Sequence, residues 1–393
     1  MKEPKFWSKQ GVLFLAWVVL IATSSQPSPE KLAVVLHISA STVSIAFDLL
    51  KYLGICLILV LGAPPKWSLL WPSFIFIGLM AASVPFSVDI VHSALTVGMI
   101  LVTLLVSIRT GFALSPKMLI GGAVVGLLAV LVPSLFFLRV GIYDPVTGVF
   151  GTRNEIARIA TYCAILSVAS LWASRSWGKL FAGMAFMFST WFCWYTESAT
   201  ALTTLVAFLA VFLLVLKVGW PLSPLQVALS TFVVGIFLVV VPMSYRLFFT
   251  LTGRDITFTG RTDIWDYAWT SVAARPIFGY GAEAFWSSDG GRQGRTTLGD
   301  AAVHSHNTWI ELYLSLGVIG GTLAILILGA QVLTLFRAIP SRLEGGKLVV
   351  AIFCGITAIT VMYGFSEHAA YRPFYSLVFI YLALSISLTR VPR

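Results

Sequence analysis

The sequence predicts an all-α, polytopic integral membrane protein with about twelve transmembrane helices and one long external loop. Apolar residues make up 58% of the 393-residue chain and charged residues only 11%, a balance that excludes a soluble globular domain. Apolar stretches of about 18 residues or more, long enough to cross a bilayer, recur along almost the whole length. We therefore treat residues 1–393 as a single transmembrane domain.

The expected spans follow one another with mostly short gaps. They cover residues 9–25, 44–63, 68–85, 88–108, 117–138, 155–174, 177–196, 198–217, 224–243, 307–336, 347–365 and 371–388. The first could pass for a signal peptide, because a basic start precedes a short apolar run. We interpret it as an uncleaved span, since that completes an even number.

Basic residues in the short gaps predict the orientation of the chain. With the N-terminus in the cytoplasm, most of these residues fall inside, and the C-terminus does too. The long loop, about 244–306, then lies in the periplasm. The net charge of +10 is scattered over span ends and gives no nucleic-acid signal. All four cysteines fall inside spans, so no disulfide framework is implied.

The long loop contains one expected helix, about 262–274. Thr262 can cap it, and aspartates in the first turn favour a helix N-terminus. Trp265, Trp269 and Val272 share one side, which is typical of an amphipathic helix at a membrane surface. Such a helix would either be an aromatic anchor alone or hold Arg261 rigidly at the bilayer surface.

After this helix, "GYGAEAFW" places two glycines in a tight turn, and "GGRQG" (290–294) is expected to be mobile. The span 307–336 then begins. Asn307 is a predicted N-cap, which leaves His306 outside, beside a helix N-terminus whose dipole favours anions. His304 is expected to point elsewhere. Three glycines in this span are expected to allow close helix packing: Gly317, Gly320 and Gly321.

Three further arginines lie at or inside outer span ends, namely Arg153, Arg158 and Arg372. Burying such a charge costs about 2.5–3.5 kcal/mol on insertion scales, so a charge kept there usually has a partner or a ligand. Arg372 and Glu367 could form an ion pair between the last two spans.

Taken together, these residues resemble the O-antigen ligase and polymerase superfamily. Its hallmark is a histidine followed by asparagine or serine, then nine residues, then glycine-x-x-glycine, as in His306-Asn307 and Gly317-Val318-Ile319-Gly320. An upstream arginine-tryptophan helix and a proline-x-x-glycine-x-glycine turn match as well. The residues concerned are Arg261, Trp265, Pro276, Gly279 and Gly281.

The resemblance extends over about residues 140–375. The segment "GVFGTRNEIA" (148–157) is similar to one that the family places before a span, with Arg153 where a lysine is common. "TGRTDIW" especially resembles exopolysaccharide polymerisation proteins of the succinoglycan type.

The resemblance implies a GT-C-like, polyprenyl-diphosphate-dependent glycosyltransferase in the bacterial inner membrane, with its active site facing the periplasm. Such an enzyme takes a glycan from an undecaprenyl-diphosphate carrier. It passes the glycan to a growing repeat, as a polymerase, or to lipid A core, as a ligase. No cofactor, metal or nucleic acid is implied. The partners implied are the lipid-linked glycan, the acceptor, membrane lipids and a chain-length regulator.

One departure from the family pattern favours polymerase over ligase. Ligases often carry a serine-arginine pair at the outer end of a middle span, where this chain has Glu197-Ser198. The second arginine for the diphosphate must come from elsewhere, and Arg153 or Arg158 is the prediction.

The chemistry assigns roles to these residues. Arginines can neutralise a diphosphate leaving group through bidentate hydrogen bonds, and Arg261 is the first candidate. His306 suits a general base for the acceptor hydroxyl. It could instead cap its helix, hold Glu311 or bind a diphosphate oxygen. The supporting residues expected around them are Asn307, Glu197, Glu367, Arg372 and Trp265. A metal on His304 and His306 lacks further ligands at a suitable spacing.

A lipid-linked glycan transporter is the alternative outside this class. It would also be polytopic with buried charges. Internal repeats or paired broken helices would be expected of it, and neither is evident. A long external loop with Trp265, Trp269 and Trp286, able to stack on sugars, favours the glycosyltransferase.

Overall fold

A computed structural model describes residues 8–136, 147–174, 176–196, 198–218, 261–299, 302–339, 346–366 and 376–390. Throughout these ranges the regular elements are helices and no strand occurs. The long helices are α1 (Lys9–Thr23), α3 (Ala40–Leu61), α4 (Trp71–Ser83), α5 (Ile90–Ala113), α6 (Pro116–Leu131), α8 (Arg153–Ala173), α9 (Trp177–Tyr195), α10 (Ala199–Val218), α12 (Arg261–Ala274), α14 (Thr308–Ala338), α15 (Gly346–Ser366) and α16 (Ser376–Leu388). Shorter pieces are α2 (Pro29–Leu36), α13 (Asp289–Leu298) and the 3-10 turns η1 (Trp67–Leu69), η2 (Val84–Phe86) and η4 (Phe285–Ser287).

The all-α, polytopic membrane fold predicted from the sequence is confirmed. Within the described ranges, six helices are long and apolar enough to cross a bilayer: Ala40–Leu61, Ile90–Ala113, Pro116–Phe136, Thr200–Lys217, Thr308–Ala338 and Leu348–Phe365. Three other expected spans are shorter apolar helices, at Lys9–Thr23, Trp71–Phe86 and Val378–Leu388. The 15 residues of α1, for example, measure about 22 Å at 1.5 Å per residue, less than the ~30 Å of a hydrocarbon core. The expected span 224–243 lies outside the described residues, so the number of twelve stays a prediction.

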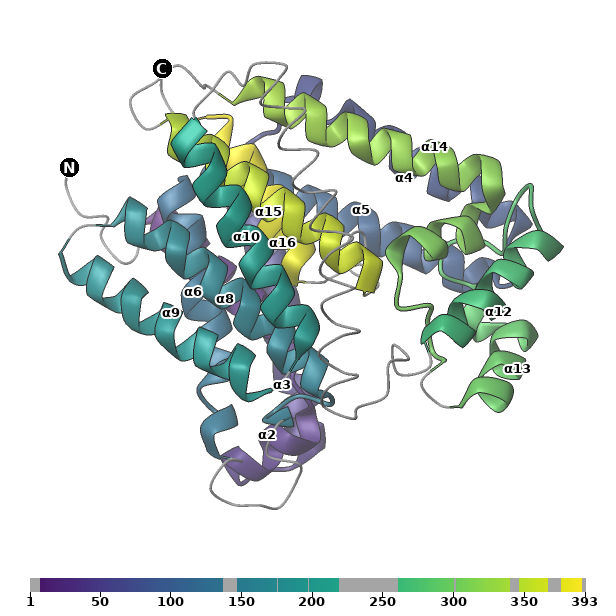
Figure 1. Ribbon diagram of the computed structural model, residues 1–393, viewed down its shortest axis with the longest axis horizontal. Helices are drawn as coiled ribbons and strands as arrows, with labels where there is room; N and C mark the ends of the chain where they lie inside the picture. The colour runs from purple at the N-terminus through teal and green to yellow at the C-terminus, as the bar shows by residue number, and fades with distance from the viewer. Residues whose placement is uncertain are drawn as a thin grey trace.

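The bundle that α1, α6, α8 and α9 form is held by close contacts between apolar and small side chains. Trp17 of α1 is fully buried, and its indole Nε1 donates to Leu119 O of α6 at 3.0 Å. Glycines of α6 let the two helices approach, because a Cβ atom on Gly126 would lie 2.7 Å from Val18 O. α8 packs against both α6 and α9, and Figure 1 shows these three helices together on one side of the molecule.

A second group of helices belongs to the long loop. α12 packs against α13 and against the beginning of α14, around buried Ile264, Ala268, Phe285 and Leu314. In Figure 1 this group lies at the right, well separated from α8 and α9. We call α12, α13, the segment 275–288 and residues 302–316 the outer cluster.

The structure corrects two expectations for the outer cluster. The segment expected to be mobile forms α13, capped by the Ser288 hydroxyl, and its glycines serve close packing: a Cβ on Gly291 would lie 2.4 Å from Trp286 Cα. The helix expected at 262–274 is present, but it begins at Arg261, so Thr262 is not its cap.

The buried residues of α12 are Arg261, Ile264, Ala268 and Val272. Trp269 is 45% exposed. The membrane-facing stripe of Trp265, Trp269 and Val272 stays a prediction.

Candidate active site

The first part of α14, residues 308–316, is a short helical piece. A break in the helical backbone at Gly317 separates it from the rest of α14. Asn307 caps it, because its side-chain Oδ1 accepts from Trp309 N at 3.0 Å and from Ile310 N at 3.2 Å. At Gly317 the backbone leaves helical geometry, with φ 70° and ψ −175°. The predicted cap is confirmed, and His306 is therefore not the capping residue.

The break at Gly317 is filled by the segment that follows α12. Tyr280 N donates to Leu314 O at 2.8 Å, Gly281 N donates to Ser315 O at 3.0 Å, and Val318 N donates to Pro276 O at 2.7 Å. These bonds satisfy backbone groups that the broken helix leaves without intrahelical partners. These three hydrogen bonds hold the end of the short piece 308–316 against the 276–281 turn.

Glycine is required at two positions where the turn and α14 meet, at Gly279 in the turn and at Gly317 in the helix. Gly279 has φ 65°, and a Cβ there would lie 2.6 Å from Gly317 N. A Cβ on Gly317 would lie 2.5 Å from Ile277 O. The expectation of helix–helix packing at Gly317 is wrong: the two glycine motifs of the sequence instead contact each other. Gly320 and Gly321 face Leu316 and Tyr313 of the preceding piece.

Glu311 lies in the first turn of α14 and is only 2% exposed. Its Oε1 accepts from Ser305 N at 2.5 Å and from Trp286 Nε1 at 2.9 Å. A carboxylate in the first helical turn is also favoured by the helix dipole. Glu311 thereby ties the loop before α14 to the turn before α13.

A second indole fixes the same loop from α12. Trp265 Nε1 donates to Ser305 O at 2.8 Å, and the Ser305 hydroxyl donates to Asn307 O at 2.9 Å. His306, between these two residues, has φ 52°, a left-handed value that is uncommon for a residue other than glycine. Such a conformation costs of the order of 1–3 kcal/mol and persists where the surroundings determine it. The surroundings here are Trp265, Glu311 and the Asn307 cap.

The two histidines of the motif lie against each other. Their ring centroids are 4.0 Å apart at an interplanar angle of 72°, and His306 N donates to His304 Nδ1 at 3.3 Å. The expectation that His304 points away is wrong, because the left-handed residue turns the chain back on itself.

Arg261 is 7% exposed at the start of α12. It precedes Trp265 by one helical turn, so both residues project from the same side of the helix. Since the Trp265 indole contacts Ser305, the structure places Arg261 in the outer cluster with His306. A side chain buried among protein groups does not fit the reading of Arg261 as a surface anchor.

Two other arginines of the outer cluster serve the local fold. The Arg275 guanidinium lies 5.1 Å from the centroid of the Tyr280 ring, and Arg295 Nη1 donates to Trp286 O at 2.7 Å. Burial raises the pKa of the Tyr280 phenol, although the charge of Arg275 lowers it. Both arginines have roles in the turn between α12 and α13.

Arg153 and Arg158 lie elsewhere, at the beginning of α8. Thr152 and Glu155 form a capping box there, and Arg158 is 4% exposed. α8 packs mainly against α6, α9 and α10, and Figure 1 shows it apart from α12 and α13. The structure therefore does not bring these arginines beside His306.

Three other predicted residues, Glu197, Glu367 and Arg372, lie outside the described residues. Ser198 is described, and its hydroxyl donates to Asn154 Oδ1 at 3.4 Å, which joins the start of α10 to α8. Over the described ranges, no group of three or more His, Cys, Asp or Glu residues is placed to hold a metal ion.

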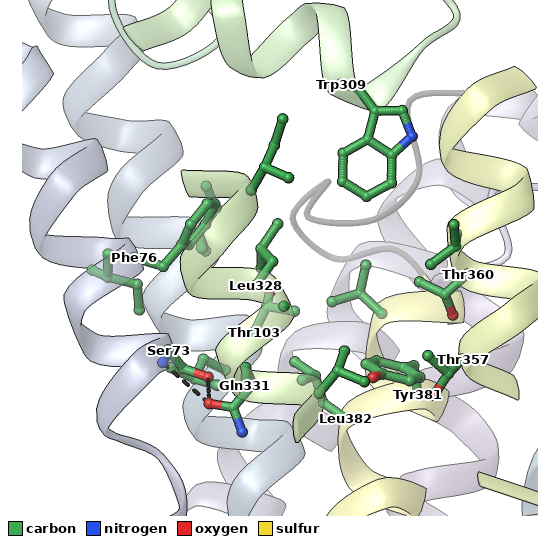
Figure 2. Close-up of a pocket in the computed structure, with 18 residues that line it drawn as sticks. Ser73, Phe76, Thr103, Trp309, Leu328, Gln331, Thr357, Thr360, Tyr381 and Leu382 are labelled. Carbon is green, nitrogen blue, oxygen red and sulfur yellow. Dashed lines mark hydrogen bonds between the residues drawn. The ribbon is translucent and has the colours of Figure 1, made fainter. Parts of the chain in front are cut away.

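An apolar cavity of about 250 Å³ lies beside α14. Trp309, two residues after Asn307, lines one end, and Ser73, Gln331, Thr357 and Tyr381 line the other (Figure 2). Aliphatic side chains of α4, α5, α14, α15 and α16 make up most of its wall. We call it the membrane cavity, and it begins next to the His306–Asn307 pair.

Comparisons with known proteins agree with this geometry. The family model described as O-antigen ligase matches residues 182–325, a range that contains α12, α13 and the break in α14. The resemblance to the O-antigen ligase and polymerase superfamily is confirmed. Exopolysaccharide production protein ExoQ of Rhizobium meliloti (strain 1021) is 26% identical over 309 residues, which cover 74% of this chain and 69% of that protein.

These matches and the six candidate spans indicate a bacterial membrane protein of the type that polymerises or ligates glycans. The sequence analysis identified His306, Asn307, Arg261 and Trp265, and the outer cluster contains all four. It did not identify His92 and Glu283, which line a pocket next to His304. Like His306, Glu283 has a positive φ, here 53°. Nothing in the sequence around Glu283 indicates this backbone conformation.

Proposed function

We propose that this protein is a membrane glycosyltransferase that moves a glycan from a polyprenyl-diphosphate donor to a sugar hydroxyl at the periplasmic face. The observation that carries the proposal is the position of His306. Its ring centroid lies 4.0 Å from that of His304, which lines a polar pocket, and Trp309, three residues farther on, lines the apolar membrane cavity, so a ligand with a polar head and a hydrocarbon tail fits around it. A lipid-linked glycan has this shape.

The proposed step is a displacement at the anomeric carbon of the donor sugar. His306 removes the proton of the acceptor hydroxyl, whose oxygen attacks that carbon and forms the new glycosidic bond. The bond from the anomeric carbon to the diphosphate oxygen breaks, and the diphosphate leaves with the electron pair. Attack opposite the leaving group inverts the anomeric centre. A base of this kind contributes typically about 10²–10⁴-fold to the rate.

Arg261 is proposed to bind the diphosphate, because a guanidinium matches two phosphate oxygens at once. Its place one turn from Trp265 puts this charge in the same cluster as His306. Arg153 and Arg158 remain proposed as the second source of positive charge, although α8 lies apart from α12. In this scheme arginines stabilise the leaving group electrostatically, the role that a metal has in other transferases.

Polymerisation is favoured over ligation to lipid A core. Glu197-Ser198 stands where ligases often have a serine-arginine pair. The relative from Rhizobium meliloti is described as an exopolysaccharide production protein, which points to the same choice.

The test is a reconstitution in liposomes with a lipid-diphosphate oligosaccharide as donor. A ladder of longer lipid-linked glycans is the expected product, detected by gel electrophoresis after acid release. Transfer only when lipid A core is supplied would identify a ligase. Movement of intact donor between leaflets without any new glycosidic bond would support the transporter and contradict the proposal.

A further inference from the structure

A second cavity, of about 270 Å³, lies in the outer cluster beside His304 of the histidine pair. Its lining residues are His92, Glu283, Trp286, Ser287, Val303, His304 and Glu311. We call it the outer pocket. Its volume is far above the ~10–15 Å³ that a single water needs, so it has room for one sugar residue with its hydroxyl groups.

The pocket is built from three distant parts of the chain, and hydrogen bonds connect them. Val88 N donates to Tyr280 O at 3.0 Å, and the Ser93 hydroxyl donates to Ala282 O at 3.1 Å, which fixes the start of α5 to the 280–284 turn. Glu283 N donates to the Ser315 hydroxyl at 3.2 Å, which fixes that turn to α14. The walls are therefore held in place without a ligand.

The lining is acidic on one side and aromatic on another. Two carboxylates, Glu283 and Glu311, contribute to it, and the Trp286 indole supplies the apolar surface. Glu311 Oε1 accepts from Ser305 N and Trp286 Nε1 and so positions the loop, and we therefore assign the contact with a ligand to Glu283. Carboxylates accept hydrogen bonds and do not donate them when ionised, so they suit ligands with hydroxyl donors.

The same charges argue against other small ligands. A phosphate or a uronic acid would bring a negative charge next to the Glu283 carboxylate, which is unfavourable at short distance. The described residues offer no arrangement of three ligands for a metal ion. An uncharged sugar remains, with hydroxyls for the carboxylates and a ring face for the tryptophan.

The pocket is adjacent to the proposed reacting group. His304 lines it, and the His304 ring lies 4.0 Å from the His306 ring between centroids. The membrane cavity begins at Trp309, farther along the same segment. A sugar in the outer pocket and a lipid tail in the membrane cavity would thus approach His306 from different directions.

We propose that the outer pocket is the acceptor subsite and binds a neutral sugar residue, with Glu283 as its specificity-determining residue. This inference rests on the proposed function, since it needs an acceptor. Glu283 accepts hydrogen bonds from the sugar hydroxyls, Trp286 packs on the ring, and the attacking hydroxyl is directed to the histidine side of the pocket. Acidic sugars are excluded by charge.

The experiment measures sugar binding without donor, by saturation-transfer NMR on the full-length protein in nanodiscs. The probes are methyl glucoside, which is neutral, and methyl glucuronide, which is its acidic counterpart. Wild type is expected to give a signal with the glucoside alone. Glu283→Gln should weaken glucoside binding about tenfold, the loss of one hydrogen bond to a charged group, and should gain a signal with the glucuronide.

Two further variants separate the pocket from general effects. Val303→Trp places a bulky side chain at a lining residue that is 51% exposed, so it should remove the glucoside signal without disturbing the core. Asp289→Asn is the matched control, because this carboxylate pairs with Arg292 on the outer surface of α13. It should bind both probes as wild type does.

Each outcome decides a different point. Unchanged glucoside binding in Glu283→Gln or in Val303→Trp would overturn the acceptor subsite. The acceptor subsite would also be overturned if wild type binds neither probe and yet polymerises glycans in liposomes. Glucoside binding with the expected variant pattern, but no transfer from any lipid-linked donor, would contradict the proposed function and leave the sugar site standing.

Discussion

The outer cluster and the bundle of α1, α6, α8 and α9 are stabilised in different ways. In the bundle, position is determined by many apolar contacts, as at Trp17, which is buried on all sides. In the outer cluster, a few hydrogen bonds from side chains to backbone place His306, and Trp265 and Glu311 make two of them. It follows that one substitution in the outer cluster can displace the reacting group. One substitution in the bundle is expected mainly to lower the free energy of unfolding.

Among the residues around His306, the largest effect is expected at Glu311. In Glu311→Ala, Ser305 N and Trp286 Nε1 lose their acceptor, so the His306 loop shifts. Displacing a reacting group by about 1 Å can cost about 10²-fold in rate, and transfer in liposomes should fall by that order. Glu311→Gln keeps an acceptor oxygen and should retain much of the activity. If the glutamine variant is folded and as inactive as the alanine variant, the charge of Glu311 matters and its positioning role is wrong.

The next effect is expected at Arg261. Arg261→Lys keeps the charge but loses the two-pronged hydrogen bonds, and one lost charge-assisted bond corresponds to about ten- to a hundredfold in affinity. Donor binding, measured with a fluorescent polyprenyl-diphosphate glycan, should weaken accordingly. Arg292→Lys on exposed α13 is the control and should bind as wild type does. Full activity of Arg261→Lys would reduce Arg261 to a structural residue.

The membrane cavity predicts a smaller and more selective effect. Gly329 lines it, and a Cβ there would meet no atom within 4 Å, so Gly329→Leu fills space without a clash. Each buried CH₂ of a lipid tail contributes about 0.8 kcal/mol, so displacing one or two should raise the KM for a long-chain donor about tenfold. A donor with a short prenyl chain should be unaffected. Gly78→Leu on α4, also without a neighbour within 4 Å, is the matched control. Equal changes in both variants would show that the cavity does not hold the tail.

The smallest expected effect compares two indoles that each donate one hydrogen bond to a backbone carbonyl. Trp265→Phe removes a hydrogen bond to Ser305 O, and Trp17→Phe removes one to Leu119 O. Each bond contributes about 0.5–1.5 kcal/mol, so both variants should lose a few degrees in Tm at most. Only Trp265→Phe should also lower transfer per folded molecule, by several-fold. A similar loss of transfer in Trp17→Phe would remove the distinction between the two regions.

The sequence predicted the helices because long apolar runs dominate it. It also predicted the Asn307 cap, since a short polar side chain before such a run has few other roles. The helix of the long loop was predicted within a residue of its start.

Other features depend on contacts between distant segments and have no local signal. The break at Gly317 exists because Pro276 and Tyr280 bind its freed backbone groups, and a glycine in an apolar run looks the same with or without them. α13 was not predicted, because its glycines were interpreted as a sign of mobility. In the structure these glycines allow close packing against Trp286 and Tyr267. His92 and Glu283 both line the outer pocket, although they are nearly two hundred positions apart in the sequence. No rule of sequence spacing connects two residues so far apart.

The most direct measurement of the central claim uses purified His306→Gln with donor lipid and acceptor supplied. Glutamine can still donate a hydrogen bond to a phosphate, but it cannot accept a proton near neutral pH. We expect transfer to fall about 10²–10⁴-fold while the Kd for the lipid-linked donor stays within about twofold of wild type. Substantial transfer by His306→Gln would contradict the role of general base, and a donor affinity that falls together with transfer would instead make His306 a ligand of the diphosphate.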